Sequence, residues 1–359
     1  MDRATIQVYE ERGSSWAAMR RPGRRLDAIN FARVVENVVG KGAVRVDLGC
    51  GGGRYLAEIG HPAIGIDASL AMLATCRQAV PGSSLVCGDL EAMPFGLRRI
   101  KAGWANMSYL HVPRADLPLA LADLQRVLDV GAPIDIQVLA GDFEGNDLPD
   151  DDVGGRFFAA WQPDAMTDVL VGAGFEDVEV SVTGDLLKAK AVRARTLPDT
   201  VRVGMKLLVV GLNPSIYSAD AGAPFARPGN RFWPAATAAG VVTRERDAFH
   251  ALKVDGVGMT DLVKRANARA NDLTVDEYAD GFSRVERLVR WLRPGAILFA
   301  GLAGWRSVVD QKAQPGVQTK RIGGRPVYVM PSPSGANAHA PLDSLIEHMR
   351  RASALAEKS

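Results

Sequence analysis

The feature that most constrains the fold is an apolar run at residues 207–210, LLVV, which breaks abruptly into Gly-Leu-Asn-Pro-Ser. The length and β-branched content of this run predict a buried strand. Asn213 precedes a proline and should stay extended, whereas Pro214 suits the first turn of a helix. Ligands of α/β sheets bind beyond the carboxyl ends of the strands. The segment therefore predicts an α/β unit in which Asn213 either binds a ligand or, more simply, caps a helix.

The rest of the second half repeats this alternation of strands and helices. Residues 206–210, 256–262, 296–300 and 326–330 predict strands, and residues 231–239, 275–292 and 303–309 predict helices. Each strand ends in a candidate site loop, such as Thr260 and Asp261 after the second strand. The pattern predicts a small parallel sheet between helical layers.

The first half carries a glycine-rich loop between a strand and an expected helix. Residues 44–46 predict the strand, and a helix is expected from Arg54. Between them stand Asp47, Gly49, Gly51 and Gly53, at alternating positions. Glycines let a ligand approach the backbone at the head of a helix. Asp67 ends the next strand, about 20 positions on, which is the spacing that places a carboxylate on ribose hydroxyls. Asp89 ends a third strand, so we expect a Rossmann-like parallel sheet.

The two patterns predict two domains. The chain has 359 residues, too many for one comfortable core, and a turn-like break at residues 196–200 suggests domains of 1–195 and 196–359. Residues 187–195 are either the last strand of the first domain or a basic arm. The residues from Val201 onward include 22 Lys and Arg and 14 Asp and Glu, whereas the first 200 include 21 and 27. This asymmetry predicts that only the second domain contacts nucleic acid.

The cysteine pattern bears on metal content and compartment. Cys50, Cys76 and Cys87 form no Cys-x-x-Cys pair, which disfavours a zinc site or an iron–sulfur cluster and suits a reducing cytoplasm. The amino terminus lacks the apolar core of a secretory signal, and every apolar run falls short of the roughly 18 residues of a membrane span. We expect a cytoplasmic monomer without metal or membrane contact, associated with the nucleoid when it acts on DNA.

Three segments of the second half carry a family resemblance. GLNPS, the phenylalanine of PFARPGNRFW and the later MPSPSG resemble mismatch-specific uracil/thymine-DNA glycosylases of the uracil-DNA glycosylase superfamily, over about 150 residues. The resemblance implies a three-layer α/β/α fold with a small parallel sheet. It also implies base excision repair: hydrolysis of the N-glycosidic bond of uracil, or of related damaged pyrimidines, in G·U-type mismatched double-stranded DNA, without a cofactor.

The same resemblance implies roles for individual residues. Asn213 would hold the attacking water, and Phe225 would stack on the flipped base. Ser218 would crowd a methyl group at C5 and so favour uracil over thymine. The base pocket would comprise Gly211, Leu212, Pro214, Ser218, Phe225 and Ser332, and the DNA-penetrating loop Ser334, Gly335, Ala336 and Asn337. Ala338 departs from the basic residue often found there, and His339 is either a solvated histidine, a phosphate contact or a late acid. Candidate phosphate contacts are Arg227, Arg231, Lys264, Arg265, Arg269, Lys320, Arg321 and Arg325.

The first half resembles a second family, the class I S-adenosylmethionine-dependent methyltransferases, over residues 20–182. The resemblance rests on Asp-x-Gly-x-Gly-x-Gly from Asp47, followed by Asp67 and Asp89. It implies that the glycines lie beside the methionine moiety, Asp67 on the ribose and Asp89 on the adenine amino group. Acceptors would meet the donor at residues 106–109. Neither an Asn/Asp-Pro-Pro-aromatic segment nor a Pro-Cys nucleophile is present, which argues against DNA methylation and leaves the acceptor open.

Three interpretations of the whole chain follow. In the first, it is a DNA glycosylase fused to a methyltransferase-like domain that binds S-adenosylmethionine. In the second, it is primarily a methyltransferase whose second half is a nucleic-acid-binding module. In the third, the first half is a cofactor sensor without catalysis.

Overall fold

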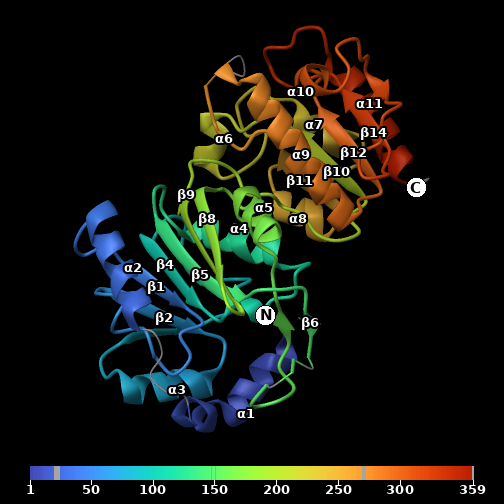
Figure 1. Cartoon of the computed structure of the whole chain (residues 1–359). Coiled ribbons are helices and arrows are strands. Elements are labelled where there is room, and N and C mark those ends of the chain that lie inside the picture. Colours follow the sequence, from blue (N-terminus) through green and yellow to red (C-terminus); the bar gives the residue numbers. More distant parts are fainter. Residues whose placement is uncertain (20–24, 147, 150, 269–271, 358–359) are drawn as a thin grey trace. The chain divides into compact units, whose positions relative to one another are not determined.

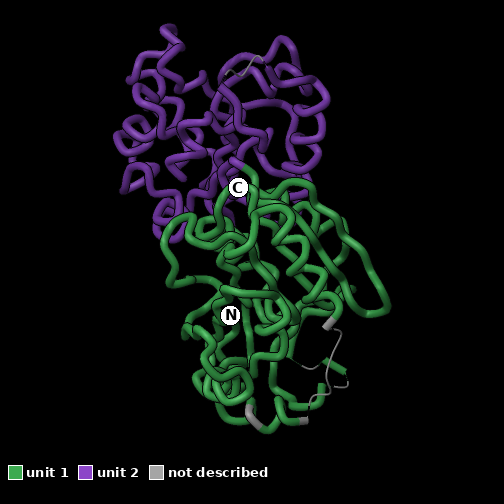
Figure 2. The backbone as a smooth tube through the Cα atoms, turned by 90° about the vertical axis from the view of Figure 1, so that its left-hand side faces the viewer, with its two compact units in different colours: residues 1–194 green, residues 195–359 purple. Residues whose placement is uncertain are grey.

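The computed structural model describes residues 1–19, 25–146, 148–149, 151–268 and 272–357. The chain divides into two compact units, unit 1 (residues 1–194) and unit 2 (residues 195–359), coloured separately in Figure 2. Within the described ranges, no helix is both long enough and apolar enough to span a membrane.

Unit 1 is built around a seven-stranded sheet of order β3-β2-β1-β4-β5-β9-β8 (Figure 1). Its strands are β1 (Arg45–Leu48), β2 (Ala63–Asp67), β3 (Ser84–Cys87), β4 (Ala102–Asn106), β5 (Pro133–Leu139), β8 (Phe175–Thr183) and β9 (Leu186–Arg193). β6 (Glu144–Gly145) and β7 (Phe158–Ala159) pair separately. The helices are α1 (Arg3–Met19), α2 (Arg25–Val38), α3 (Leu70–Ala79), the 3₁₀ helix η1 (Tyr109–His111), α4 (Leu117–Val127) and α5 (Pro163–Gly172).

The first five strands of this sheet run parallel, and the last two form an antiparallel hairpin. β1 pairs in parallel with β2 and β4, whereas β9 is antiparallel to both β5 and β8. Residues 187–195, for which the sequence allowed a strand or a basic arm, are therefore mostly strand β9 of this sheet. The helix expected from Arg54 is wrong, because residues 51–59 form consecutive turns. Three of these nine positions are glycines, whose conformational freedom opposes a regular helix.

Unit 2 holds a five-stranded sheet of order β11-β10-β12-β14-β13, parallel except for the short edge strand β13. Its strands are β10 (Leu207–Gly211), β11 (Val257–Asp261), β12 (Ala296–Ala300), β13 (Gly316–Val317) and β14 (Val327–Met330). Its helices are α6 (Ile216–Ala221), α7 (Phe232–Ala238), α8 (Ala248–Lys253), α9 (Val275–Leu292), α10 (Ala303–Val308) and α11 (Leu342–Glu357).

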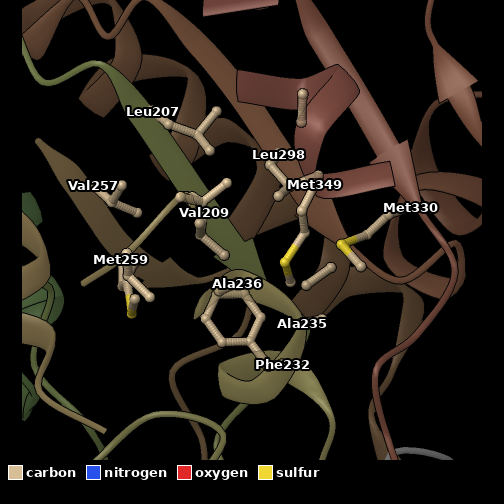
Figure 3. Close-up of a cluster of buried hydrophobic side chains, with 14 of the residues drawn as sticks. Leu207, Val209, Phe232, Ala235, Ala236, Val257, Met259, Leu298, Met330 and Met349 are labelled. Atoms are coloured by element: carbon tan, nitrogen blue, oxygen red, sulfur yellow. The ribbon is translucent and has the colours of Figure 1, made fainter. Parts of the chain in front are cut away.

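Helices cover both faces of the unit 2 sheet. Alternate strand residues such as Leu207, Val209 and Leu298 pack with α7 and α11, through Phe232 and Met349 among others (Figure 3). On the opposite face, Phe299 of β12 meets Trp305 of α10, with ring centroids 5.1 Å apart. Every residue of β10 is buried, because this strand is internal and covered on both sides. This placement explains the unbroken apolar run and puts its carboxyl end in the middle of the sheet edge.

Candidate functional site

Asn213 lies two residues beyond the carboxyl end of β10 and is half-buried. Its Nδ2 donates to three oxygens: the carbonyls of Pro214 and Arg265, each at 3.1 Å, and Oδ1 of Asn267 at 2.8 Å. Asn267 belongs to the segment after β11, which also runs beside Ser215 through a parallel bridge. The side chain of Asn213 is thus held by two neighbouring segments of the sheet edge.

These contacts fix which end of the Asn213 amide faces outward. Backbone carbonyls can only accept hydrogen bonds, so the nitrogen must lie on the side of Pro214 and Arg265. Across the described ranges, no group donates to Asn213 Oδ1. The carboxamide oxygen therefore remains available to accept a hydrogen bond from a water molecule, without any titration of the side chain.

Phe225 adopts a strained backbone conformation beside β10. Its φ is +55°, which non-glycine residues rarely adopt. Its ring stacks on Phe232 with centroids 4.0 Å apart and an interplanar angle of 14°. A Cβ added to Gly211 would lie 3.6 Å from Phe225 Cζ. The ring is therefore held in one orientation, close to the strand end that carries Asn213.

Ser218 stabilises the turn that contains Phe225. It is only 3% exposed, and its Oγ accepts hydrogen bonds from Ala226 N at 3.2 Å and from Ser215 Oγ at 3.1 Å. Ser215 in turn caps α6 by accepting from Ser218 N. The hydroxyl of Ser218 is thus committed to the backbone next to Phe225.

Two small cavities flank the end of β10. One of about 70 Å³ is lined by Gly211, Leu212, Ser332 and residues of the β12–α10 turn, and one of about 100 Å³ is lined by Phe225 and Asp261 among others. Neither lining includes Asn213, Pro214 or Ser218. The predicted base pocket is therefore divided between two spaces, each well below the roughly 300 Å³ of a typical ligand pocket. A flipped base would require these residues to move.

Asp261 is a candidate site residue for which the sequence suggested a position but no role. It ends β11 and lines the Phe225 cavity, and its Oδ1 lies only 2.3 Å from where a Gly211 Cβ would stand. Within the described ranges its carboxyl group accepts no hydrogen bond. Burial raises the pKa of Asp261 to about 6, against the opposing charge of Lys264. In the sequence, the only indication that Asp261 belongs to the site was the position of Thr260 and Asp261 at the end of a predicted strand.

A buried ion cluster fixes β11 against α9. Arg284 Nη1 donates to Asp199 Oδ2 at 2.7 Å, and Lys264 Nζ donates to Asp199 Oδ1 at 2.8 Å. Burial alone would raise the pKa of Asp199, but the charges of Arg284 and Lys264 outweigh it and lower that pKa. Backbone packing adds to this contact, because a Cβ on Gly281 of α9 would lie 2.0 Å from the Leu262 carbonyl oxygen.

The predicted penetrating loop has an exposed tip and an anchored base. Gly335, Ala336, Ala338 and His339 are exposed, whereas Ser334 and Asn337 are half-buried. Asn337 Nδ2 donates to the carbonyl of Ser332 at 3.0 Å, and Asn337 N donates to that of Ser334 at 2.9 Å. The loop is therefore closed by its own hydrogen bonds.

The candidate phosphate contacts differ in how free their side chains are. Lys264 is bound to Asp199, Arg265 pairs with Glu277 at 2.6 Å, and Arg231 is bound to backbone carbonyls. Arg227 is exposed, and its guanidinium makes no hydrogen bond to the described part of the chain. Arg269 lies outside the described residues. The remaining candidates are Lys320, which lies over the Phe282 ring, Arg321, which donates to Gly324, and Arg325.

Unit 1 contains a much larger cavity, of about 520 Å³. Its lining includes five of the six residues predicted to bind the cofactor: Asp47, Gly49, Gly51, Gly53 and Asp67. Asp89 is not among the lining residues. Its carboxylate instead accepts hydrogen bonds from the Met1 amino group at 3.0 Å and from Glu91 N at 3.0 Å. The cavity brings the glycine loop together with Tyr9, Trp16, Asn106, Ser108 and His111 from other segments.

Two side-chain oxygens at this cavity have no hydrogen-bond partner in the part of the chain that the structure describes. Asp47 Oδ2 and Ser108 Oγ are buried without a hydrogen bond to the described residues. Asp67 is better satisfied, since its two oxygens accept from Gly51 N at 2.8 Å and Ser69 N at 2.9 Å. Burial raises the pKa of both Asp47 and Asp67. Because buried polar atoms are rarely left unpaired, the cavity fits a ligand that carries its own polar groups.

Glycine is required where the loop meets the rest of this cavity. A Cβ on Gly49, whose φ is +72°, would lie 2.4 Å from Ser108 Cβ. The absent side chain leaves a cradle between the loop and the end of β4, as a cofactor lying along the backbone needs.

A histidine that the sequence did not indicate lies at the same cavity. His111 Nδ1 lies 2.7 Å from the Phe157 carbonyl, which can only accept, so Nδ1 carries the proton. Nε2 then accepts from the Tyr9 hydroxyl at 2.9 Å, and Arg156 Nη1 donates to the same hydroxyl at 3.0 Å. Burial lowers the pKa of His111 to about 4, so the ring is neutral at pH 7. Tyr9 lies 102 positions away, which explains why sequence spacing carried no signal.

The chain is a two-domain α/β protein, with a Rossmann-like methyltransferase fold followed by a uracil-DNA-glycosylase-like domain. This confirms the predicted fold class. Residues 198–352 match the family model of the uracil DNA glycosylase superfamily, and residues 46–131 match that of a methyltransferase domain.

The solved structures that are similar to part of this chain include the following three. A SAM-dependent methyltransferase from Methanosarcina mazei shares 16% identity, over 45% of this chain and 97% of its own, with a TM-score of 0.39. One from Mesorhizobium loti shares 21% identity, over 45% and 95%, with a TM-score of 0.38. DesVI of Streptomyces venezuelae shares 18% identity, over 54% and 99%, with a TM-score of 0.40.

Proposed function

We propose that unit 2 is a mismatch-specific DNA glycosylase that removes uracil from G·U-type mismatched duplexes. The match of residues 198–352 to the uracil DNA glycosylase superfamily supports a glycosylase. The observation that carries the mechanism is the amide of Asn213, whose nitrogen is held by two carbonyls while its oxygen accepts no hydrogen bond from the described residues.

The reaction hydrolyses the bond between deoxyribose C1′ and the base nitrogen. Asn213 Oδ1 accepts a hydrogen bond from water and directs the water oxygen to C1′. The base leaves with the bonding electrons, and the water proton passes to solvent. An amide is a weak base, so most of the rate enhancement must come from stabilising the separated charges. Backbone N–H groups after β10 and in the loop from Ser332 are the proposed donors to the anionic base.

Flipping the base requires the two flanking cavities to merge. Phe225 lines one cavity, and Gly211, Leu212 and Ser332 line the other. In this proposal the incoming base lies against Phe225 near Gly211. Ser218 acts by holding the turn at Phe225, and the preference for uracil over thymine then depends on how far that turn can yield to a methyl group.

We also propose that unit 1 binds S-adenosylmethionine, supported by the match of residues 46–131 to a methyltransferase domain. When bound, this cofactor supplies an electrophilic methyl group. Asp47 Oδ2 and Ser108 Oγ, which have no partner among the described residues, would contact its amino acid portion, and Asp67 would contact the ribose hydroxyls. An adenine contact by Asp89 would require its hydrogen bond to Met1 to break.

Cleavage of a G·U duplex tests the glycosylase proposal. Asn213→Ala should lower the single-turnover rate at least roughly a hundredfold, because a group that acts on the transition state is lost. Asn30→Ala, which changes an exposed asparagine of α2, serves as the control and should cleave like the wild type. Equal base release by the Asn213→Ala variant and the wild type would remove Asn213 from the mechanism.

A further inference from the structure

Arg231 precedes α7 and binds the 332–340 loop through most of its donors. Its Nη1 donates to the Ala340 carbonyl at 2.7 Å. Its Nη2 donates to the Ser334 carbonyl at 2.8 Å and to the Asn337 carbonyl at 2.6 Å. Its backbone N–H donates to the Pro333 carbonyl at 2.9 Å. One residue thus reaches both ends of the loop and its middle, about 100 positions away in sequence.

The contacts of Arg231 are all to backbone carbonyls of the loop and leave the side chains at its tip free. Gly335, Ala336 and Ala338 are exposed and carry no side chain longer than a methyl group. A Cβ on Gly335 would lie 2.8 Å from the Gly229 carbonyl oxygen, so the loop also packs closely on the chain before Arg231. The loop is therefore a narrow projection of fixed shape.

We propose that Arg231 is a positioning residue that keeps the 332–340 loop preformed for entry into a base stack, and that cleavage of base-paired DNA therefore depends on Arg231 more than cleavage of a single strand does. This inference rests on the proposed glycosylase function of unit 2. A loop that is already ordered loses little conformational entropy when it enters the duplex, so more of the binding energy is available for base extrusion.

The geometry distinguishes this role from a phosphate contact. A phosphate-binding arginine presents its planar edge to solvent, whereas Arg231 is half-buried and its Nε is buried without a partner in the described part of the chain. Three of its hydrogen bonds are donated by the two terminal nitrogens, Nη1 and Nη2, in directions fixed by the planar guanidinium group. A lysine would preserve the charge and lose this arrangement.

The experiment compares single-turnover cleavage of two oligonucleotides by the full chain. One is a G·U duplex and the other is the same uracil-containing strand alone. We expect Arg231→Lys to cleave the duplex at least roughly tenfold more slowly, the equivalent of one charge-assisted hydrogen bond, and the single strand at the wild-type rate. Arg351→Lys, at an exposed arginine of α11 paired with Glu347, is the matched control and should match the wild type on both.

A second variant separates loop positioning from phosphate binding. Arg227→Gln, at the exposed arginine before Arg231, should weaken binding of both strand forms alike and reduce the salt dependence of binding. If Arg231→Lys lowers cleavage of duplex and single strand by the same factor, or of neither, the positioning role is wrong. If the wild type releases no uracil from either oligonucleotide, the proposed function of unit 2 fails instead. Single-strand cleavage by the Arg231→Lys variant also shows that it is folded.

Discussion

At the scale of single residues, the site depends on an amide whose orientation is set by its neighbours. The sequence predicted Asn213 and its place at a strand end, because an apolar run followed by Asn-Pro is a local signal. It did not predict Asn267, whose Oδ1 accepts from Asn213 Nδ2, because that contact spans 54 positions and arises only when β10 and β11 pair. Local sequence patterns can identify a candidate residue such as Asn213, whereas its hydrogen-bond partners depend on how the strands pair.

Replacing Asn267 should affect catalysis more than binding. Asn267→Ala removes one of three acceptors for Asn213 Nδ2, so the single-turnover rate should fall by about two- to tenfold, while the affinity for product DNA stays unchanged. Asn267→Asp keeps the accepting oxygen and should restore the rate. Because Asn267 Nδ2 has no partner in the described part of the chain, its loss breaks no other hydrogen bond. Equal losses in both variants would show that the residue acts only through folding.

The ionised carboxylate of Asp261 should lower the stability of the fold at pH values above the folded-state pKa of this residue. The carboxyl group binds a proton more tightly in the folded state, with a pKa of about 6 instead of 3.8, so stability falls as the pH rises between these values. Asp261→Asn should therefore stabilise unit 2 above pH 6, by up to about 3 kcal/mol, and change little below pH 4. Hydrogen exchange of β10 and β11 amides, compared with the wild type at each pH, measures the difference. A variant that is less stable at pH 8 would contradict this.

At the scale of elements, long and strongly patterned segments were predicted with their bounds, whereas the short helices were predicted unevenly. The bounds of α9 and β12 agree with the sequence prediction, since α9 begins with a complete capping box at Thr274 and Glu277. Among the helices of 6 residues, α10 was predicted as residues 303–309 and α6 only as a helix after Pro214, whereas α8 was not predicted. Residues 51–59 had the sequence of a Rossmann helix start, but their glycines form turns. The conformations of the loops around the sites could not be predicted from local sequence patterns.

The ion cluster between β11 and α9 should be a main source of stability in unit 2. Asp199→Ala leaves Arg284 and Lys264 buried without their partner, which should cost about 3–5 kcal/mol. Since the pKa of Asp199 is lowered, this contribution is present above pH 3.8 and disappears as the pH falls through the folded pKa. Asp220→Ala breaks the exposed pair with Arg195, which solvent screens, and should change stability much less than Asp199→Ala does. Urea unfolding at pH 7 compares the two; similar losses would contradict the cluster's role.

At the scale of the whole molecule, two separate sites can be disabled one at a time. Asp67 accepts two backbone N–H groups, and an asparagine can accept only one of them, so Asp67→Asn should weaken S-adenosylmethionine binding at least roughly tenfold. Calorimetric titration measures this loss. The same variant should release uracil like the wild type, and Asn213→Ala should bind the cofactor normally. Loss of both activities in either variant would show that the sites are coupled.

The close approach of Gly281 to the Leu262 carbonyl extends the reach of the proposed glycosylase site into a helix that need never meet DNA. With a Cβ position 2.0 Å from a carbonyl oxygen, α9 admits no side chain at this point without displacing the chain that follows β11. That chain leads from Asp261 to Asn267. In a genetic screen for mutators, substitutions at position 281 would therefore be recovered together with substitutions at the proposed reaction centre. Gly281 itself takes no part in the reaction; its importance lies only in how closely α9 approaches the chain after β11.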